Sequence, residues 1–261
     1  LWFVTQGAVL ETPHPEQAAL WGLAATLALE HPELSCRCMD ADALDDIVRE
    51  LAAVPSTPEA AILWRQSQRR CARLVRARLP RMVPPTLRGT ALITGAFGGL
   101  GRQVASWAAE HGAEQLVLVG RHADTPEAHA FAESLAIPVR RVATDVSRRD
   151  EVDRLIAGLA DLPPLRSVFH IAGTQAPGLL ADLDWADFHA ALDAKAGGAW
   201  CLHQATLGQA LDHFVLFSSI ASVLGAAGQG GYAAANALLD ALARHHRSQG
   251  LPAVSIAWGR W

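Results

Sequence analysis

The chain has 261 residues, 51% of them hydrophobic and 18% charged, and a formal net charge of −4 at pH 7. This balance predicts a globular protein with one large domain or two small ones and enough apolar material for a buried core. The negative charge argues against a bulk nucleic-acid binder, no run approaches the ~20 apolar residues of a membrane span, and no signal segment opens the chain. We therefore expect a cytoplasmic protein with neither nucleic acid nor membrane as a partner.

Four cysteines are spread along the chain, at positions 36, 38, 71 and 201. Cys36 and Cys38 would share one face of a strand and are poorly placed to bridge each other. No Cys-x-x-Cys or Cys/His spacing typical of a zinc site occurs. We expect free thiols in a reducing compartment and no metal site.

Residues 1–85 alternate strand-like and helix-like stretches without a recognisable site. The Ala/Leu-rich segment Pro15–Glu30 predicts a helix that His31-Pro32 ends, and apolar residues along one side of 44–51 predict a second, amphipathic helix. The Pro84-Pro85 pair predicts a linker to the rest of the chain. Three apolar runs predict strands: Leu1–Val4, Cys36–Met39 and Ala61–Trp64.

From residue 86 onward the chain alternates regularly between apolar runs and helix-like segments. Near-continuous apolar runs are typical of parallel strands that helices cover on both faces. Helices are expected to begin after Gly99 and near Asp150, Trp185 and Gly231. The pattern predicts a doubly wound parallel α/β sheet of the Rossmann type, the architecture of nucleotide-binding folds. The predicted strands are Ala91–Thr94, Gln115–Val119, Val139–Thr144, Ser167–Ile171, His213–Phe217 and Ala253–Ala257.

The segment Thr94-Gly95-Ala96-Phe97-Gly98-Gly99-Leu100-Gly101 lies between the first of these strands and the helix that follows. A pyrophosphate binds against backbone N–H groups at a helix N-terminus, and side chains there would hold it away, so this chemistry requires glycines. A tight strand-to-helix turn also favours glycine, but the place between a strand and an amphipathic helix favours a dinucleotide site. We expect this segment to bind a cofactor.

The next strand ends in Val119-Gly120-Arg121. In NAD-selective sites an acidic residue at this place accepts the ribose 2′-hydroxyl group. Here no carboxylate is present, and Arg121 is placed to pair with a 2′-phosphate. An incidental surface arginine is the alternative interpretation, and we favour NADPH over NADH.

A cluster of polar residues begins with Ser218-Ser219 at a strand end. Tyr232, the only tyrosine, and Asn236 are four residues apart, so they lie on one face of a helix. A phenol has an unperturbed pKa of about 10 and exchanges its proton near neutrality only beside a cation. Lys195 is the only lysine in the chain, and arginine stays charged and cannot relay a proton. A compositional bias against lysine would also explain why the chain has a single one. We predict that Lys195 is the cation that lets the Tyr232 hydroxyl group exchange its proton near neutrality.

With these residues the chain resembles the short-chain dehydrogenase/reductase superfamily, and within it the ketoreductase domains of modular (type I) polyketide synthases. The glycine segment matches the superfamily pattern Thr-Gly-x-x-x-Gly-x-Gly. In ordinary members the lysine follows the tyrosine by four residues and an asparagine lies on the preceding helix. Here Asn236 takes the first place and Lys195 the second, as in the synthase ketoreductases. The stretch 219–236 and the ending Trp258-Gly259-Arg260-Trp261 are similar to theirs as well.

The resemblance implies catalytic roles for Tyr232, Ser219, Lys195 and Asn236. Tyr232 would donate a proton to the developing alkoxide, and Ser219 would hydrogen-bond that oxygen. Lys195 would lower the pKa of the tyrosine and contact the cofactor ribose. Asn236 would hold the Lys195 side chain or a water molecule in the proton relay.

The resemblance also implies further contacts to NADPH. Asp145-Val146 would border the adenine and Ala172-Gly173 would line the nicotinamide side, together with Lys195 and Tyr232. Residues 1–85 would be the C-terminal part of a structural subdomain, a partial, degenerate Rossmann-like unit without a cofactor site, and 86–261 would be the catalytic subdomain. By the same resemblance, the first half of the structural subdomain and the helical lid after the last strand are absent.

The function implied is NADPH-dependent reduction of a β-ketoacyl thioester to the β-hydroxyacyl thioester during polyketide chain extension. The substrate would arrive on the phosphopantetheine arm of an acyl carrier protein, beside neighbouring synthase domains. One alternative is a reductase-silent domain that epimerises an α-substituent or serves as a scaffold, against which the presence of all four catalytic residues argues. The other is a free-standing short-chain alcohol dehydrogenase, against which the extra N-terminal subdomain argues.

Product stereochemistry has incomplete marks in this sequence. The family's Leu-Asp-Asp mark of a D-hydroxy product is replaced by Gln175-Ala176-Pro177, and the tryptophan that marks an L-hydroxy product is replaced by Leu224. The acidic guide is missing, whereas leucine still supplies apolar bulk on the other entry path. We therefore expect an L-hydroxy product.

Overall fold

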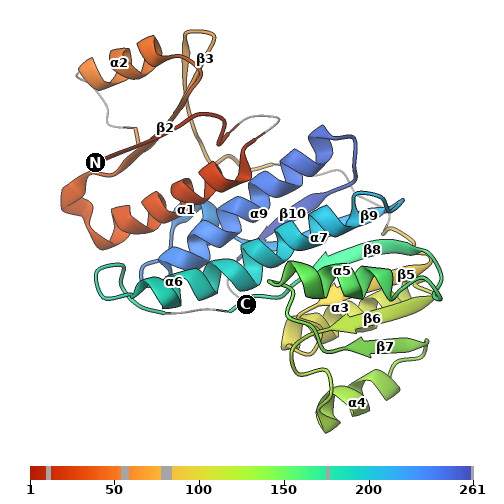
Figure 1. Cartoon of the computed structure of the whole chain (residues 1–261). Helices are drawn as coiled ribbons and strands as arrows, with labels where there is room; N and C mark the ends of the chain where they lie inside the picture. The colour runs from red at the N-terminus through yellow and green to blue at the C-terminus, as the bar shows by residue number, and fades with distance from the viewer. Residues whose placement is uncertain (10–12, 54–58, 78–83, 175–176, 260–261) are drawn as a thin grey trace.

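The structure, a computed structural model, describes residues 1–9, 13–53, 59–77, 84–174 and 177–259. Its strands form a four-stranded sheet near the N-terminus and a six-stranded sheet in the rest of the chain (Figure 1). Gln175, Ala176, Arg260 and Trp261, which entered the sequence predictions, lie outside the described residues.

The six-stranded sheet consists of β5 Thr90–Thr94, β6 Gln115–Val119, β7 Val139–Val142, β8 Leu165–His170, β9 His213–Ser219 and β10 Val254–Trp258. Its order is β10-β9-β8-β5-β6-β7, and all neighbouring strands are parallel. The chain starts in the middle at β5, runs outward to β7, returns to β8 beside β5, and runs outward again to β10. This is the doubly wound Rossmann order, so the predicted fold class is confirmed.

The helical segments of this part are α3 Gly99–Glu110, α4 Pro126–Glu133, α5 Arg149–Ala157, α6 Trp185–Leu192, the π-helix η2 Asp193–Gly197, α7 Gly198–Thr206, α8 Ala221–Leu224 and α9 Gly230–Ser248. They cover both faces of the sheet. Successive side chains of a strand point to opposite faces, and every residue of β5 and β6 is buried, so both faces must be covered. Leu92 joins the core that α5, α7 and α9 cover. Ala91 and Ile93 join the core that α3 covers.

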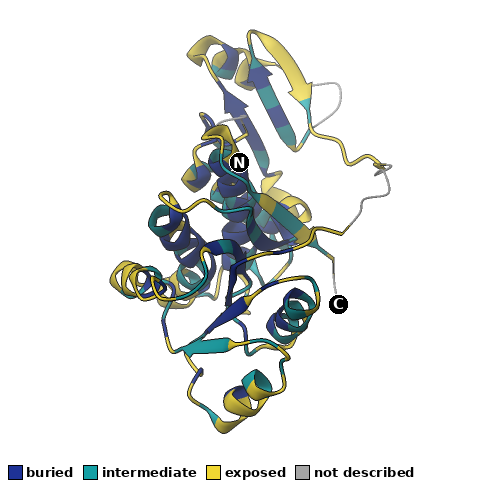
Figure 2. Ribbon diagram, turned by 90° about the vertical axis from the view of Figure 1, so that its right-hand side faces the viewer, coloured by how far each residue is buried: buried dark blue, intermediate teal, exposed yellow. Residues whose placement is uncertain are grey.

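The N-terminal part contains β1 Trp2–Thr5, α1 Pro15–Glu30, the 3-10 helix η1 Pro32–Leu34, β2 Arg37–Ala41, α2 Leu44–Ala52, β3 Ala61–Arg65 and β4 Gln68–Cys71. Strands β1, β2 and β3 are parallel, whereas β4 is antiparallel to β3 and forms the exposed edge (yellow in Figure 2). Nothing in the sequence pattern predicts β4. It follows the two-residue turn Gln66-Ser67, in which φ is positive at both positions, and such turns usually contain Asn or Gly.

Helix α2 turns its apolar side outward, although an amphipathic helix normally buries that side. Leu44, Val48 and Leu51 are 72%, 57% and 50% exposed. The acidic side faces the sheet instead, because β3 and β4 offer hydrogen-bond donors there. Glu50 is buried and accepts a hydrogen bond of 2.7 Å from Arg69 Nε.

No metal cluster and no membrane helix occur among the residues that the structure describes. No group of three His, Cys, Asp or Glu side chains is arranged to hold a metal ion. None of the helices is long and apolar enough to cross a bilayer. The four cysteines are free thiols.

Helix α1 packs along α9 and thereby joins the N-terminal part to the larger sheet (Figure 1). The two helices approach so closely at Gly22 that an added Cβ would lie 2.3 Å from the carbonyl oxygen of Ala233. Because that oxygen belongs to the backbone, no flexible side chain is available to move away. Only glycine at position 22 permits this approach.

The change Gly22→Ala is expected to lower the free energy of unfolding by about 1–3 kcal/mol, as other overpacked helix contacts do. Urea unfolding of the wild type and the variant measures this difference. Gly208→Ala is the matched control, because a Cβ at Gly208 would meet no atom within 4 Å. Equal losses in both variants would contradict the close contact between α1 and α9.

Candidate functional site

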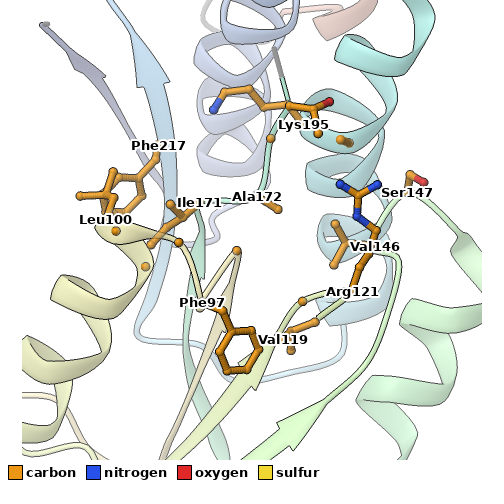
Figure 3. Close-up of a pocket in the computed structure, with 18 of the residues that line it drawn as sticks. Phe97, Leu100, Val119, Arg121, Val146, Ser147, Ile171, Ala172, Lys195 and Phe217 are labelled. Atoms are coloured by element: carbon orange, nitrogen blue, oxygen red, sulfur yellow. The ribbon is translucent and has the colours of Figure 1, made fainter. Parts of the chain in front are cut away.

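A cavity of about 1180 Å³ opens at the C-terminal ends of the parallel strands. The residues that directly follow β5, β6 and β8 line it, and so does Ser219, the last residue of β9. Ligands of doubly wound sheets bind at this edge. In Figure 3, Arg121 and Val146 lie on one side of the cavity, and Leu100 and Phe217 lie on the opposite side.

The glycine-rich loop contains glycines of two kinds. At Gly95, an added Cβ would lie 2.8 Å from the backbone nitrogen of Ala172. At Gly101, it would lie 2.2 Å from the carbonyl oxygen of Gly95. Packing within the protein therefore already requires glycine at these two positions. At Gly99 a Cβ would meet no protein atom within 4 Å, and at Gly98 it would meet only the Gly95 oxygen, at 3.5 Å. These two glycines leave the N-terminus of α3 open toward the cavity, where backbone N–H groups favour an anion.

Arg121 follows β6 and lines the cavity wall. It makes no ion pair or hydrogen bond with any residue inside the described ranges. Burial raises the pKa of the nearby Asp145, but two hydrogen bonds from Ser147 and the charge of Arg121 lower it overall. The Asp145 carboxylate is therefore ionised and engaged with Ser147, which leaves the Arg121 guanidinium available to an anionic ligand.

Lys195 is carried by the π-helix η2, between α6 and α7. Widened turns of this type are frequent at functional sites. Its side chain is buried and lies against Gly173, where an added Cβ would be 3.4 Å from Lys195 Nζ. Burial lowers the pKa of Lys195 to about 8, and the charge of Asp240 opposes that shift. The lysine therefore lines the cavity with an amine that loses its charge more easily than an exposed lysine does.

The structure brings Lys195 and Tyr232 together, although they lie on different helices. The Lys195 ammonium is 5.4 Å from the centroid of the Tyr232 ring, which is an attractive cation–π distance. Tyr232 lies in the first turn of α9, and Ser219 faces the same cavity from the end of β9. The hydroxyl group of Ser218 donates to the carbonyl oxygen of Asn236 at 3.2 Å, and so ties β9 to α9.

Asn236 lies one turn after Tyr232 but does not line the cavity. It is completely buried, and its Nδ2 donates to the carbonyl oxygen of Tyr232 at 2.8 Å. Of the two contacts predicted as alternatives for Asn236, a hydrogen bond to Lys195 is not formed among the described residues, and a contact to a relay water stays a prediction. The buried Oδ1 accepts no hydrogen bond from the residues described, and it is free to accept one.

His170 holds the Lys195 segment in place, and nothing in the sequence pattern singles it out. Its Nε2 donates to the carbonyl oxygen of Lys195 at 2.8 Å. Because a neutral imidazole carries one N–H group, Nδ1 accepts from the Thr94 hydroxyl group at 2.8 Å. Burial lowers the pKa of His170 to about 3, so the ring is neutral. The same Thr94 oxygen accepts the backbone N–H of Ala172 at 3.3 Å.

The predicted catalytic and cofactor-binding residues line the cavity, except for Thr94, Ala96 and Asn236, which are buried behind it. Ser147 and Thr174, which the sequence analysis missed, each follow a predicted strand by a few residues, and that place is the signal that could have found them. Asp187 on α6 has no such signal. The missed lining residues include Thr125, Ser147, Thr174, Asp187 and Ala190.

Comparison with known proteins identifies relatives of the whole chain. The family model described as the KR domain matches residues 89–261. Polyketide synthase GfsA of Streptomyces halstedii is 43% identical over 279 residues, and the pikromycin polyketide synthase component PikAIII of Streptomyces venezuelae is 41% identical over 279 residues. Both alignments cover 100% of this chain but only 4% and 18% of those proteins, so the chain spans a small part of their length.

Solved ketoreductase structures share the fold. PlmKR1, the ketoreductase from the first module of phoslactomycin biosynthesis in Streptomyces sp. HK803, has a TM-score of 0.91 and 38% identity, with 100% of this chain and 64% of that chain covered. The first ketoreductase of the tylosin polyketide synthase has a TM-score of 0.91 and 38% identity, with 100% and 59% covered. Sequence, fold and site geometry agree that the chain belongs to the ketoreductase (KR) domains of modular type I polyketide synthases, which are related to the short-chain dehydrogenases/reductases.

Proposed function

We propose that this domain uses NADPH to reduce a β-ketoacyl thioester, carried by an acyl carrier protein, to the β-hydroxyacyl thioester. The observation that carries the proposal is the convergence of Lys195, Tyr232 and Ser219 on one cavity, which also contains an open helix N-terminus. The family implies an oxidoreductase that uses NAD(P)H. The choice of NADPH and of this thioester is inferred from the site and from the relatives.

The cavity suits a dinucleotide that carries a 2′-phosphate. Gly98 and Gly99 leave room for a pyrophosphate at the N-terminus of α3. Arg121 offers the 2′-phosphate a guanidinium that forms no ion pair or hydrogen bond with the described residues. Asp145-Val146 would border the adenine and Ala172-Gly173 the nicotinamide side. A bound NADPH supplies the hydride that the substrate's carbonyl carbon accepts.

The protein supplies the proton and holds the substrate oxygen. As the carbonyl carbon is reduced, its oxygen becomes an alkoxide and takes the proton of the Tyr232 hydroxyl group. The Ser219 hydroxyl group donates a hydrogen bond to the same oxygen and stabilises its charge. The Lys195 ammonium beside the Tyr232 ring favours the phenolate that remains. The buried Oδ1 of Asn236 would accept a hydrogen bond from this ammonium or from a water molecule of the relay.

The acyl carrier protein and the neighbouring synthase domains are proposed as partners because the relatives of this chain are far longer polyketide synthases. A reductase-silent domain, or a reductase of free alcohols, are the two competing functions. The assay offers a β-ketoacyl thioester and NADPH to the domain and follows the nicotinamide absorbance. Oxidation of NADPH that depends on the thioester supports the proposal, and its absence would exclude it.

The change Tyr232→Phe is expected to lower kcat by about 10²–10⁴-fold, because only the proton donor is removed. The Kd of NADPH, measured by fluorescence titration, is expected to stay within about twofold, since the ring beside Lys195 is retained. A variant with more than about a tenth of the wild-type turnover would show that another group donates the proton.

The pH dependence should reflect the lowered pKa of Lys195. Because burial brings this pKa to about 8, the cation is present below pH 8 and is lost as pH rises through that value. The expected profile of kcat/KM for NADPH, which reports the free enzyme, therefore falls on the alkaline side of pH 8. Lys195→Arg keeps the cation at every pH, so its profile should lack this alkaline limb even though its activity is lower. An unchanged limb in Lys195→Arg would assign it to another group.

The change Arg121→Ala is expected to weaken NADPH binding about tenfold or more and to leave NADH binding nearly unchanged, since only NADPH carries the 2′-phosphate. Titration of both cofactors measures the two Kd values. Arg154→Ala is the control, because Arg154 is exposed, pairs with Asp150 and does not line the cavity. Equal losses for both cofactors in Arg121→Ala would place the phosphate contact elsewhere.

A further inference from the structure

Glu30, the last residue of α1, binds two loops that are distant from it in the sequence. The first loop lies between β8 and α6, and the second loop lies between α8 and α9. Its Oε2 accepts the backbone N–H of Leu180 at 2.7 Å, and its Oε1 accepts the backbone N–H of Gly228 at 2.8 Å. Hydrogen bonds to an ionised carboxylate are shorter and stronger than those between neutral groups. One side chain of the N-terminal part therefore binds both loops at once.

A carboxylate is unfavourable at this end of a helix. The C-terminus carries the negative end of the helix dipole, and the last turn of α1 contains no basic residue. The intrinsic stability of α1 would be served better by a neutral or a basic residue at position 30. The two loop amides offset this cost, which indicates that Glu30 serves the loops rather than the helix.

The two loops are also joined to each other. The backbone N–H of Gly178 donates to the carbonyl oxygen of Gly228 at 3.0 Å, and Gly178 forms an isolated parallel bridge with Gln229. At Gly230, the first residue of α9, an added Cβ would lie 2.4 Å from Leu180 Cδ2, so the Leu180 side chain packs on the N-terminus of α9. A displacement of either loop would therefore displace its neighbour.

Helix α1 holds the second loop at a further point, one turn before Glu30. The Thr26 hydroxyl oxygen accepts the backbone N–H of Ala226 at 3.2 Å. Gly225, with φ of 70°, lies so close to α1 that an added Cβ would be 2.5 Å from the Ala25 carbonyl oxygen. The loop is thus fixed along one face of α1, and Glu30 binds its far end.

Both loops lead directly to the site. The described residues of the first loop resume at Pro177, three positions after Thr174, which lines the cavity. The second ends at α9, where the N–H of Ala233 donates to the carbonyl oxygen of Gln229 at 2.9 Å, immediately beside Tyr232. The two loops therefore link the N-terminus of α9, which carries Tyr232, to the chain that follows β8.

We propose that Glu30 is a positioning residue that fixes the Tyr232 end of α9 against the loop after β8, and so sets the orientation in which the thioester reaches Tyr232. This inference rests on the proposed reductase function and extends it to the N-terminal part of the chain. Glu30 itself does not line the cavity. Its influence on turnover passes through the two backbone amides that it holds.

The test is Glu30→Gln, which keeps the size of the side chain but replaces one acceptor oxygen with an NH₂ group that cannot accept a backbone N–H. Hydrogen exchange is expected to become about tenfold faster at whichever of the Leu180 and Gly228 amides loses its acceptor oxygen, and kcat/KM for the thioester about tenfold lower. The Kd of NADPH should stay within about twofold, because the glycine loop and Arg121 are untouched. Glu16→Gln, an exposed position on the same helix, is the matched control and should match the wild type in all three measurements.

Unchanged exchange at the two amides would overturn the proposal. An equal acceleration in β5 and β6, with weaker NADPH binding, would also overturn it, because that result describes general destabilisation. Faster loop exchange with unchanged kcat/KM would show that the loops are held but that turnover does not depend on them, which likewise overturns the positioning role. A wild-type domain that does not reduce the thioester would instead overturn the proposed function, while exchange at the two amides would still decide whether Glu30 holds the loops.

Discussion

The neutral imidazole of His170 joins the end of β5, where the glycine-rich loop begins, to the segment that carries Lys195. With Nε2 donating to the Lys195 carbonyl oxygen, Nδ1 can only accept, and the Thr94 hydroxyl group supplies the hydrogen. The ring packs so tightly against α7 that a Cβ at Gly198 would lie 3.0 Å from His170 Cε1 and 2.8 Å from Val146 Cγ2. A charged ring would reverse the Thr94 hydrogen bond in an interior that cannot solvate it. The burial that keeps His170 neutral therefore also keeps the lysine next to the tyrosine.

The N-terminal part contributes to this arrangement through α1. The helix meets α9 at Gly22 and ends at Glu30 between the two loops. Trp21 of this helix donates its Nε1–H to the Thr5 hydroxyl oxygen at 3.1 Å, and that hydroxyl donates at 2.7 Å to the buried carboxylate of Asp40 on β2, which also pairs with Arg65 of β3. Burial raises the pKa of Asp40, but these hydrogen bonds lower it overall, so the carboxylate stays charged. The smaller sheet thus holds the helix that contacts the loops beside Tyr232.

The sequence predicted the elements whose cause is local. The apolar runs of the larger sheet and the spacing of Tyr232 and Asn236 need only neighbouring residues to be interpreted. The features it missed depend on contacts between distant segments. The turn at Gln66-Ser67 lacks the usual Asn or Gly. The acidic side of α2 faces the sheet because hydrogen-bond donors for its carboxylates lie on β3 and β4. His170 is an ordinary strand residue until Lys195 is placed beside it, and the Leu180 amide that Glu30 binds is 150 positions away.

Lys195 gives these 261 residues a single side-chain amine, since every other basic side chain is arginine or histidine. It is 5% exposed, and its pKa of about 8 leaves part of it as the neutral, nucleophilic amine at mildly alkaline pH. An amine-acylating reagent therefore has one side-chain target, and that target lines the cavity. The mass added at Lys195 would therefore measure the fraction of molecules whose cavity is open. A bound ligand could be detected because it protects this native residue from acylation, without an engineered label.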